Sequence, residues 1–230
     1  MPQMRSIRRG LSAAAGLVSP NPIKRIEAMQ VFLSYQMHRL PGPALLEHIN
    51  EAPTLTAAHM TNARLWPIRH EMLAALPKGG RCAEVGTYRG IFSKHIAATC
   101  QPDEYHLFDI DFEPLDEEAI RAAFAGALHK HLGDSAANLR KFPAGYFDWL
   151  YIDADHSYAG VVNDLAAAHS VLKPGGYLML NDYTNWDPTS AHPYGVAKAA
   201  NEFILAENYE VVGLALDSRG FHDFLIRKPA

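Results

Sequence analysis

The chain has 230 residues, of which 48% are hydrophobic and 20% charged, and its formal net charge is −4. This is the composition of a globular domain with a sizeable core, and it excludes the strongly basic surface that binds nucleic acid or an anionic membrane. No apolar run reaches the roughly 18 residues of a membrane-spanning helix, and two cysteines give neither a disulfide scaffold nor a zinc site. We therefore expect a cytoplasmic protein with no nucleic-acid or membrane partner.

The first third of the chain, residues 1–76, predicts a helical extension. Basic residues at 5–9 precede a short Ala-rich stretch, which favours a basic arm over a secretory or twin-arginine signal because the apolar run is short. Apolar residues at helical spacing predict three helices, over 22–40, 44–49 and 57–76. A lid, a dimer contact that would make the protein a homo-oligomer, and simple packing all remain open for this extension.

From residue 77 to residue 230 the pattern alternates between strands and helices. The predicted strands are 81–85, 105–110, 129–132, 147–152, 177–180, 209–216 and 222–227, and the helices between them are 91–99, 117–128, 135–142, 158–172 and 196–207. Such alternation predicts an α/β domain with a mostly parallel sheet and helices on both faces. The last two strands, joined by the turn at 217–220, predict an antiparallel hairpin.

Acidic or amide side chains follow each of the first five strands. In chain order they are Glu84, Asp109 with Asp111, Asp134-Ser135, Asp153 with Asp155 and His156, and Asn181-Asp182. In open α/β sheets the carboxyl ends of parallel strands border one crevice, where ligands bind. Helix caps and Asx turns account for one or two such endings, and a binding site accounts for the whole set.

The turn after the first strand, residues 84–90, lacks the G-x-G-x-x-G spacing of a dinucleotide fold. Bulky Tyr88 and Arg89 stand where a pyrophosphate would approach the helix, while Gly86 still permits a tight turn. These residues favour a ligand that has a ribose but no phosphate there. Asp109, 23 residues after Gly86, is placed to accept hydrogen bonds from two ribose hydroxyls.

Four segments resemble class I S-adenosylmethionine-dependent methyltransferases. They are Glu84-Val-Gly-Thr-Tyr-Arg-Gly, Gly133-Asp-Ser, Phe147-Asp-Trp-Leu-Tyr-Ile-Asp-Ala-Asp-His-Ser-Tyr and Leu172-Lys-Pro-Gly-Gly-Tyr. The most similar branch is the metal-dependent O-methyltransferases, which include macrocin-type sugar methyltransferases, with catechol O-methyltransferase as a more distant relative. The resemblance covers about residues 78–228 and implies a Rossmann-like sheet of seven strands, mostly parallel, with the antiparallel hairpin at its C-terminal end.

The resemblance also implies ligands and roles. S-adenosylmethionine would be held by Glu84, Gly86, Tyr88 and Gly90 at its methionine part, by Asp109 at the ribose, by Asp134 and Ser135 on the adenine side, and by Asp153. A divalent cation, Mg²⁺ in the first instance, would be held by Asp153, Asn181 and Asp182. Asn181 departs from the pattern, since many of these relatives have two acids at that place, and it weakens the case for a metal.

The expected reaction is methyl transfer to a hydroxyl group of a small molecule such as a sugar, a polyketide or a phenol. A bound cation would stabilise the oxyanion, and His156 or Asp155 would take the proton. Two other interpretations remain: a metal-independent or noncatalytic S-adenosylmethionine-binding protein, which Asn181 keeps open, and an NAD(P)-dependent oxidoreductase, which the missing glycine fingerprint opposes.

Overall fold

The computed structural model describes residues 20–37, 51–187 and 192–230. The chain divides into two compact units, Met1–Ile49 and Asn50–Ala230. The first unit contains helix α2 (Pro22–Met37), which begins as the residues predict: Pro22 occupies the first turn, and the Asn21 side chain accepts a hydrogen bond from the Ile23 N–H at 2.9 Å. The helix predicted over 44–49 lies outside the described residues.

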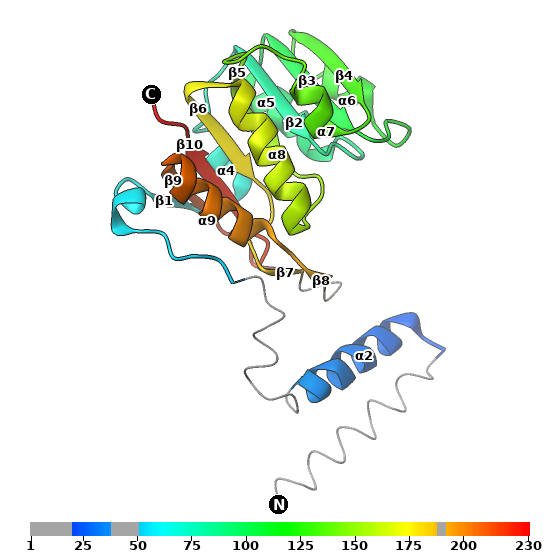
Figure 1. Cartoon of the computed structure of the whole chain (residues 1–230). Helices are drawn as coiled ribbons and strands as arrows, with labels where there is room; N and C mark the ends of the chain where they lie inside the picture. The colour runs from blue at the N-terminus through cyan, green and yellow to red at the C-terminus, as the bar shows by residue number, and fades with distance from the viewer. Residues whose placement is uncertain (1–19, 38–50, 188–191) are drawn as a thin grey trace, which may run out of the picture. The chain divides into compact units, whose positions relative to one another are not determined.

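The second unit is built on one sheet of eight strands (Figure 1). In spatial order they are β1 (Arg64–Trp66), β9 (Glu210–Ala215), β10 (Asp223–Arg227), β6 (Leu172–Leu180), β5 (Phe147–Ile152), β2 (Arg81–Val85), β3 (Glu104–Asp109) and β4 (Ala127–Leu132). Only β10 among these eight runs antiparallel to its neighbours, and it forms the predicted hairpin with β9. After β6 the chain forms a separate two-stranded antiparallel ribbon, β7 (Trp186–Asp187) and β8 (His192–Pro193).

The eighth strand corrects the prediction of seven strands and the predicted helix over 57–76. That segment instead forms a 3₁₀ turn, η1 (Ala57–Met60), then β1, then a short helix, α4 (Arg69–Leu73). Strand β1 pairs with β9 in parallel, and a Cβ atom at Gly213 would lie 1.9 Å from the Arg64 carbonyl oxygen, so the two strands approach closely because position 213 is glycine. The second unit therefore begins at Asn50, earlier than the predicted boundary at residue 77.

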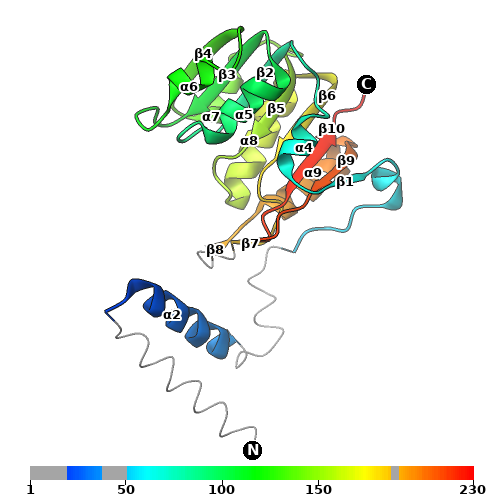
Figure 2. The same ribbon diagram turned by 180° about the vertical axis from the view of Figure 1, so that it is seen from behind.

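Helices cover both faces of the sheet, as predicted (Figures 1 and 2). Helices α7 (Ser135–Leu139), α8 (Tyr158–Val171) and α9 (Val196–Glu207) contribute to one buried apolar cluster, and α4, α5 (Ile91–Cys100) and α6 (Glu117–Arg121) contribute to the other. The helix predicted over 117–128 ends at Arg121 because β4 begins at Ala127, whose N–H donates to the Asp103 carbonyl at 2.9 Å. Large apolar side chains such as Trp149 are buried between the sheet and the helices, and their burial stabilises the packing of the helix layers on the sheet.

The register of the sheet brings the strand ends together. Strands β4, β3, β2, β5 and β6 are successive parallel neighbours, so the polar residues that follow them lie at one edge. Among the described residues, no helix combines the length and the apolar content that crossing a bilayer requires.

Candidate functional site

A cavity of about 750 Å³ opens at this edge of the sheet. Seven of the eight residues predicted to bind the cofactor line it: Glu84, Gly86, Tyr88, Asp109, Asp134, Ser135 and Asp153. They come from the ends of four neighbouring strands, which is the arrangement that the topology of a parallel sheet dictates. The eighth, Gly90, sits at the start of α5 with φ +74°, where a Cβ atom would meet the Ile120 side chain at 2.8 Å, so its visible role is packing.

Gly86 shows why the first turn needs a glycine. Its φ is +85°, and a Cβ atom there would lie 2.1 Å from the Asp153 carbonyl oxygen. The Asp153 N–H in turn donates to the Val85 carbonyl at 2.7 Å, which ties the end of β5 to the end of β2. The turn therefore brings the backbone of two strand ends into contact beneath the cavity.

Asp109 organises the other side of the same turn. One carboxylate oxygen accepts hydrogen bonds from the Thr87 and Tyr88 N–H groups, both at 2.8 Å, and the other accepts from the Asp111 N–H at 3.1 Å. Burial raises the pKa of Asp109, but these hydrogen bonds outweigh it, and the pKa lies below its ordinary value. Asp109 is thus an ionised acceptor in the cavity wall. Asp111 turns its carboxylate to the Glu113 N–H instead.

Glu84 is the most deeply buried acid of the cavity wall, with 1% of its surface exposed. The Tyr105 hydroxyl donates a hydrogen bond to it, and burial raises its pKa to about 7. A carboxyl group held near its titration point in a cavity is able to ionise when a cationic ligand group enters.

The acids after β4 and β5 make local hydrogen bonds while they line the cavity. Asp134 caps α7 by accepting from the Ala137 N–H at 2.7 Å, and the Ser135 hydroxyl donates to Asp164 at 2.6 Å. Asp155 accepts from both the N–H and the hydroxyl of Ser157, at 2.8 and 2.9 Å. Both carboxylate oxygens of Asp155 therefore accept local hydrogen bonds, and the residue faces the larger cavity.

A second cavity, of about 250 Å³, lies over the end of β6 and is lined by Asn181 and Asp182. Here the imidazole of His156 is the common neighbour of the three residues predicted to hold a cation. Its Nε2 lies 3.3 Å from the Asn181 side-chain oxygen, 3.6 Å from an Asp153 oxygen and 3.7 Å from an Asp182 oxygen. The ring stacks on Tyr194, with 4.7 Å between the ring centroids. The structure thus brings together Asp153, His156, Asn181 and Asp182.

Excess negative charge surrounds this group. Burial, together with the nearby Asp182 carboxylate, holds the pKa of Asp153 well above its usual range, and burial raises the pKa of both Asp182 and Asp223 to about 6. Groups with such pKa values, gathered in a cavity, are typical of functional sites.

Arg69 supplies the positive charge that partly balances these acids, and the sequence interpretation did not identify it. Its guanidinium donates to the Tyr151 hydroxyl at 3.1 Å, and that hydroxyl also lies 3.1 Å from Asp223 and 3.4 Å from Asp153. Arg69 lines both cavities and so connects them. Asp223 was detectable as an acid that opens an otherwise apolar strand, whereas nothing in the sequence near Arg69 distinguishes it.

The three residues predicted to hold a cation, Asp153, Asn181 and Asp182, all present side-chain oxygen atoms near His156. Oxygen donors fit the ligand preference of a hard divalent cation such as Mg²⁺.

Comparison with known proteins finds a family model that matches the region of the site. Residues 83–183 match the model of a family described as a methyltransferase domain, and this range contains every residue predicted for the site. No curated protein matches the chain significantly.

Three solved structures illustrate the likeness in fold. A protein described as a SAM-dependent methyltransferase from Methanosarcina mazei has a TM-score of 0.52 at 15% identity, over 71% of this chain and 98% of that one. The N-methyltransferase NodS from Bradyrhizobium japonicum, in complex with S-adenosylhomocysteine, has a TM-score of 0.53 at 16% identity, over 70% and 86%. TrmK of M. capricolum, also with S-adenosylhomocysteine, has a TM-score of 0.52 at 13% identity, over 72% and 70%. Residues 83–183 thus match a methyltransferase domain family, and the fold is that of the solved S-adenosylmethionine-dependent methyltransferases.

Proposed function

We propose that this chain, through its methyltransferase domain, transfers a methyl group from S-adenosylmethionine to a hydroxyl group of a small molecule. The observation that carries the proposal is the larger cavity, whose wall collects the acids from four strand ends. Its volume of about 750 Å³ falls in the range of roughly 300–1,000 Å³ common for small-molecule sites.

The cavity offers one partner for each polar part of the cofactor. Glu84 would face the cationic amino group of the methionine part, which favours the ionised carboxylate. Asp109 is ionised, and its oxygen that accepts from Asp111 retains capacity to accept from ribose hydroxyls. The resemblance to methyltransferases assigns Asp134 and Ser135 to the adenine side. Tyr88, whose side chain is exposed, also lines this cavity.

The smaller cavity would receive the methyl acceptor. Methyl transfer forms an oxygen–carbon bond as the sulfur–carbon bond breaks, and the hydroxyl proton must leave the acceptor. His156 is the residue we assign to take it, since burial lowers the pKa of its imidazole and so favours the neutral ring, the form that can act as a base. Asp155, the other candidate, makes its hydrogen bonds to Ser157 and faces the larger cavity.

A divalent cation is a second element of the proposal, supported by the oxygen donors of Asp153, Asn181 and Asp182 around a group of acids with raised pKa values. When bound there it would supply Lewis-acid stabilisation of the acceptor oxyanion. The residues themselves hold and orient His156: three oxygens surround its Nε2, and Tyr194 packs against its ring.

The test is methyl transfer from isotopically labelled S-adenosylmethionine to a panel of sugars, phenols and polyketides, with amines included because one of the similar structures is an N-methyltransferase. Product mass and release of S-adenosylhomocysteine are measured with Mg²⁺, with Mn²⁺ and with a chelator. Labelled O-methyl product that falls in His156→Gln, but not in the control His59→Asn outside both cavities, supports the proposal. Cofactor binding without transfer to any hydroxyl would favour the alternative of a noncatalytic binding protein, and labelled amines would move the acceptor to nitrogen.

A further inference from the structure

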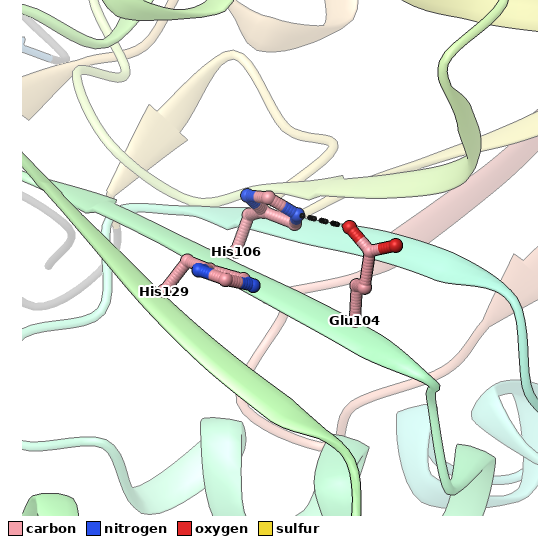
Figure 3. A group of neighbouring side chains, drawn as sticks. All are labelled: Glu104, His106 and His129. Carbon is pink, nitrogen blue, oxygen red and sulfur yellow. Dashed lines mark ion pairs between the residues drawn. The ribbon is translucent and has the colours of Figure 1, made fainter.

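A second group of potential metal ligands lies on the sheet, away from both cavities. Glu104 and His106 stand two residues apart on β3, and His129 is paired directly with His106 on β4 (Figure 3). One donor atom from each residue lies within 4.8 Å of the others, and within residues 20–37, 51–187 and 192–230 this is the one group of three His, Cys, Asp or Glu residues to meet that distance. Glu104 opens β3 and Asp109 closes it, so at ~3.3 Å per residue the group is roughly 10–16 Å from the cofactor cavity wall.

The buried imidazole of His106 points to a missing ligand. Only 3% of this residue is exposed, and its Nδ1 lies 3.0 Å from Nε2 of His131. Its Nε2 is buried, has no hydrogen-bond partner among the described residues, and faces a Glu104 oxygen at 3.5 Å. Buried polar atoms are almost always satisfied, so this nitrogen needs an explanation.

The contact between His106 Nδ1 and His131 Nε2 fits two tautomers. In the tautomer whose Nδ1–H donates to His131, the Nε2 lone pair points towards the Glu104 carboxylate, and two acceptors face each other without a proton between them. A metal-bound histidine commonly donates its other ring N–H to a neighbour in this way. A cation between Nε2 and the carboxylate would satisfy both atoms.

Two hydrogen bonds fix the Glu104 carboxylate beside His106. The Tyr146 hydroxyl donates at 2.6 Å to the oxygen that faces His106, and the Arg81 Nε donates at 3.0 Å to the other oxygen.

We propose that Glu104, His106 and His129 bind a divalent transition metal, Zn²⁺ or one with similar preferences, and that the ion ties the edge strand β4 to β3. Two imidazoles and a carboxylate are typical zinc ligands, and bonds of ~2.0–2.2 Å at tetrahedral angles place neighbouring ligand atoms ~3.4 Å apart. The 3.5 Å between His106 and Glu104 already has that spacing. His129 is exposed and stacked on His106 at 4.6 Å, so a side-chain rotation brings its nitrogen to the ion. This site is independent of the proposed methyl transfer.

The experiment is calorimetric titration of the full, untagged chain with Zn²⁺, paired with Co²⁺ substitution, whose visible absorption reports nitrogen and oxygen ligation. His129→Ala removes an exposed ligand and leaves the core intact. Tyr146→Phe removes only the hydroxyl that orients Glu104. His59→Asn is the control for a histidine outside the group, and Asp182→Asn is the control for ion binding in the smaller cavity.

We expect a saturable Zn²⁺ site that is lost in His129→Ala, weakened about tenfold in Tyr146→Phe, and retained in both controls. Melting temperature should rise with Zn²⁺ in the wild type and not in His129→Ala. Absence of saturable binding, retention of it in His129→Ala, or its loss in Asp182→Asn would each overturn the proposal.

Discussion

Glu84 allows a quantitative test of the cavity's electrostatics by the substitution Glu84→Gln. Burial raises the pKa of this carboxyl from 4.5 to about 7. The folded protein therefore holds the Glu84 proton more tightly than the unfolded chain does. Its contribution to stability is complete below pH 4.5 and is lost as the pH rises through 7. At ~1.4 kcal/mol per pH unit, ionising Glu84 lowers the free energy of unfolding by roughly 3 kcal/mol at most.

Glutamine has nearly the same shape, accepts the hydrogen bond from Tyr105 and does not ionise. The difference in free energy of unfolding between variant and wild type should thus grow in favour of the variant from pH 5 to about pH 7 and then level off towards pH 8.5, at up to roughly 3 kcal/mol. Urea denaturation at several pH values measures it, and the other buried acids, being common to both proteins, largely cancel in the difference. S-adenosylmethionine should bind the variant more weakly, since the charge facing its amino group is gone. A stability difference that stays flat across this pH range would refute the assignment of Glu84 as a buried, perturbed acid.

Three further substitutions test other parts of the site. Gly86→Ala should lower the free energy of unfolding by more than the ~1–3 kcal/mol of backbone strain alone, because the new Cβ would also clash with the Asp153 carbonyl oxygen. A melting temperature like that of the wild type would contradict the geometry of the turn. Tyr151→Phe removes the hydroxyl shared by Arg69, Asp223 and Asp153 and should cost about 1–3 kcal/mol in urea denaturation, where a neutral result would show that the hydroxyl is dispensable. His156→Gln should lower kcat by ~10²–10⁴ with little change in S-adenosylhomocysteine affinity, and an unchanged kcat would remove the imidazole from the proton transfer.

The polar strand ends were predictable because parallel strands alternate with helices and all end at the same edge. The runs ending at Glu84, Asp109 and Asp153 are apolar and bounded by turn residues, so their positions follow from local pattern. That the structure gathers them around one cavity follows from topology alone.

The segment before residue 77 was not predictable in the same way. Arg64–Trp66 is too short to show alternation. It is a strand only because it pairs with β9, whose partner residues lie 149 positions later in the chain. Arg69 reaches the acids through this tertiary pairing, so its role could not be inferred from its neighbours. The buried group around His106 escaped notice for a related reason: a histidine inside a strand looks structural until the adjacent strand is known.

The central claim, that the larger cavity binds the cofactor, is tested most directly by calorimetric titration with S-adenosylhomocysteine, comparing the wild type with Asp109→Asn. We predict saturable 1:1 binding to the wild type and clearly weaker binding to the variant, in which the carboxylate that faces the ribose is neutral. Binding of equal strength to both proteins would place the ligand elsewhere, and no binding to either would contradict the assignment of the cavity.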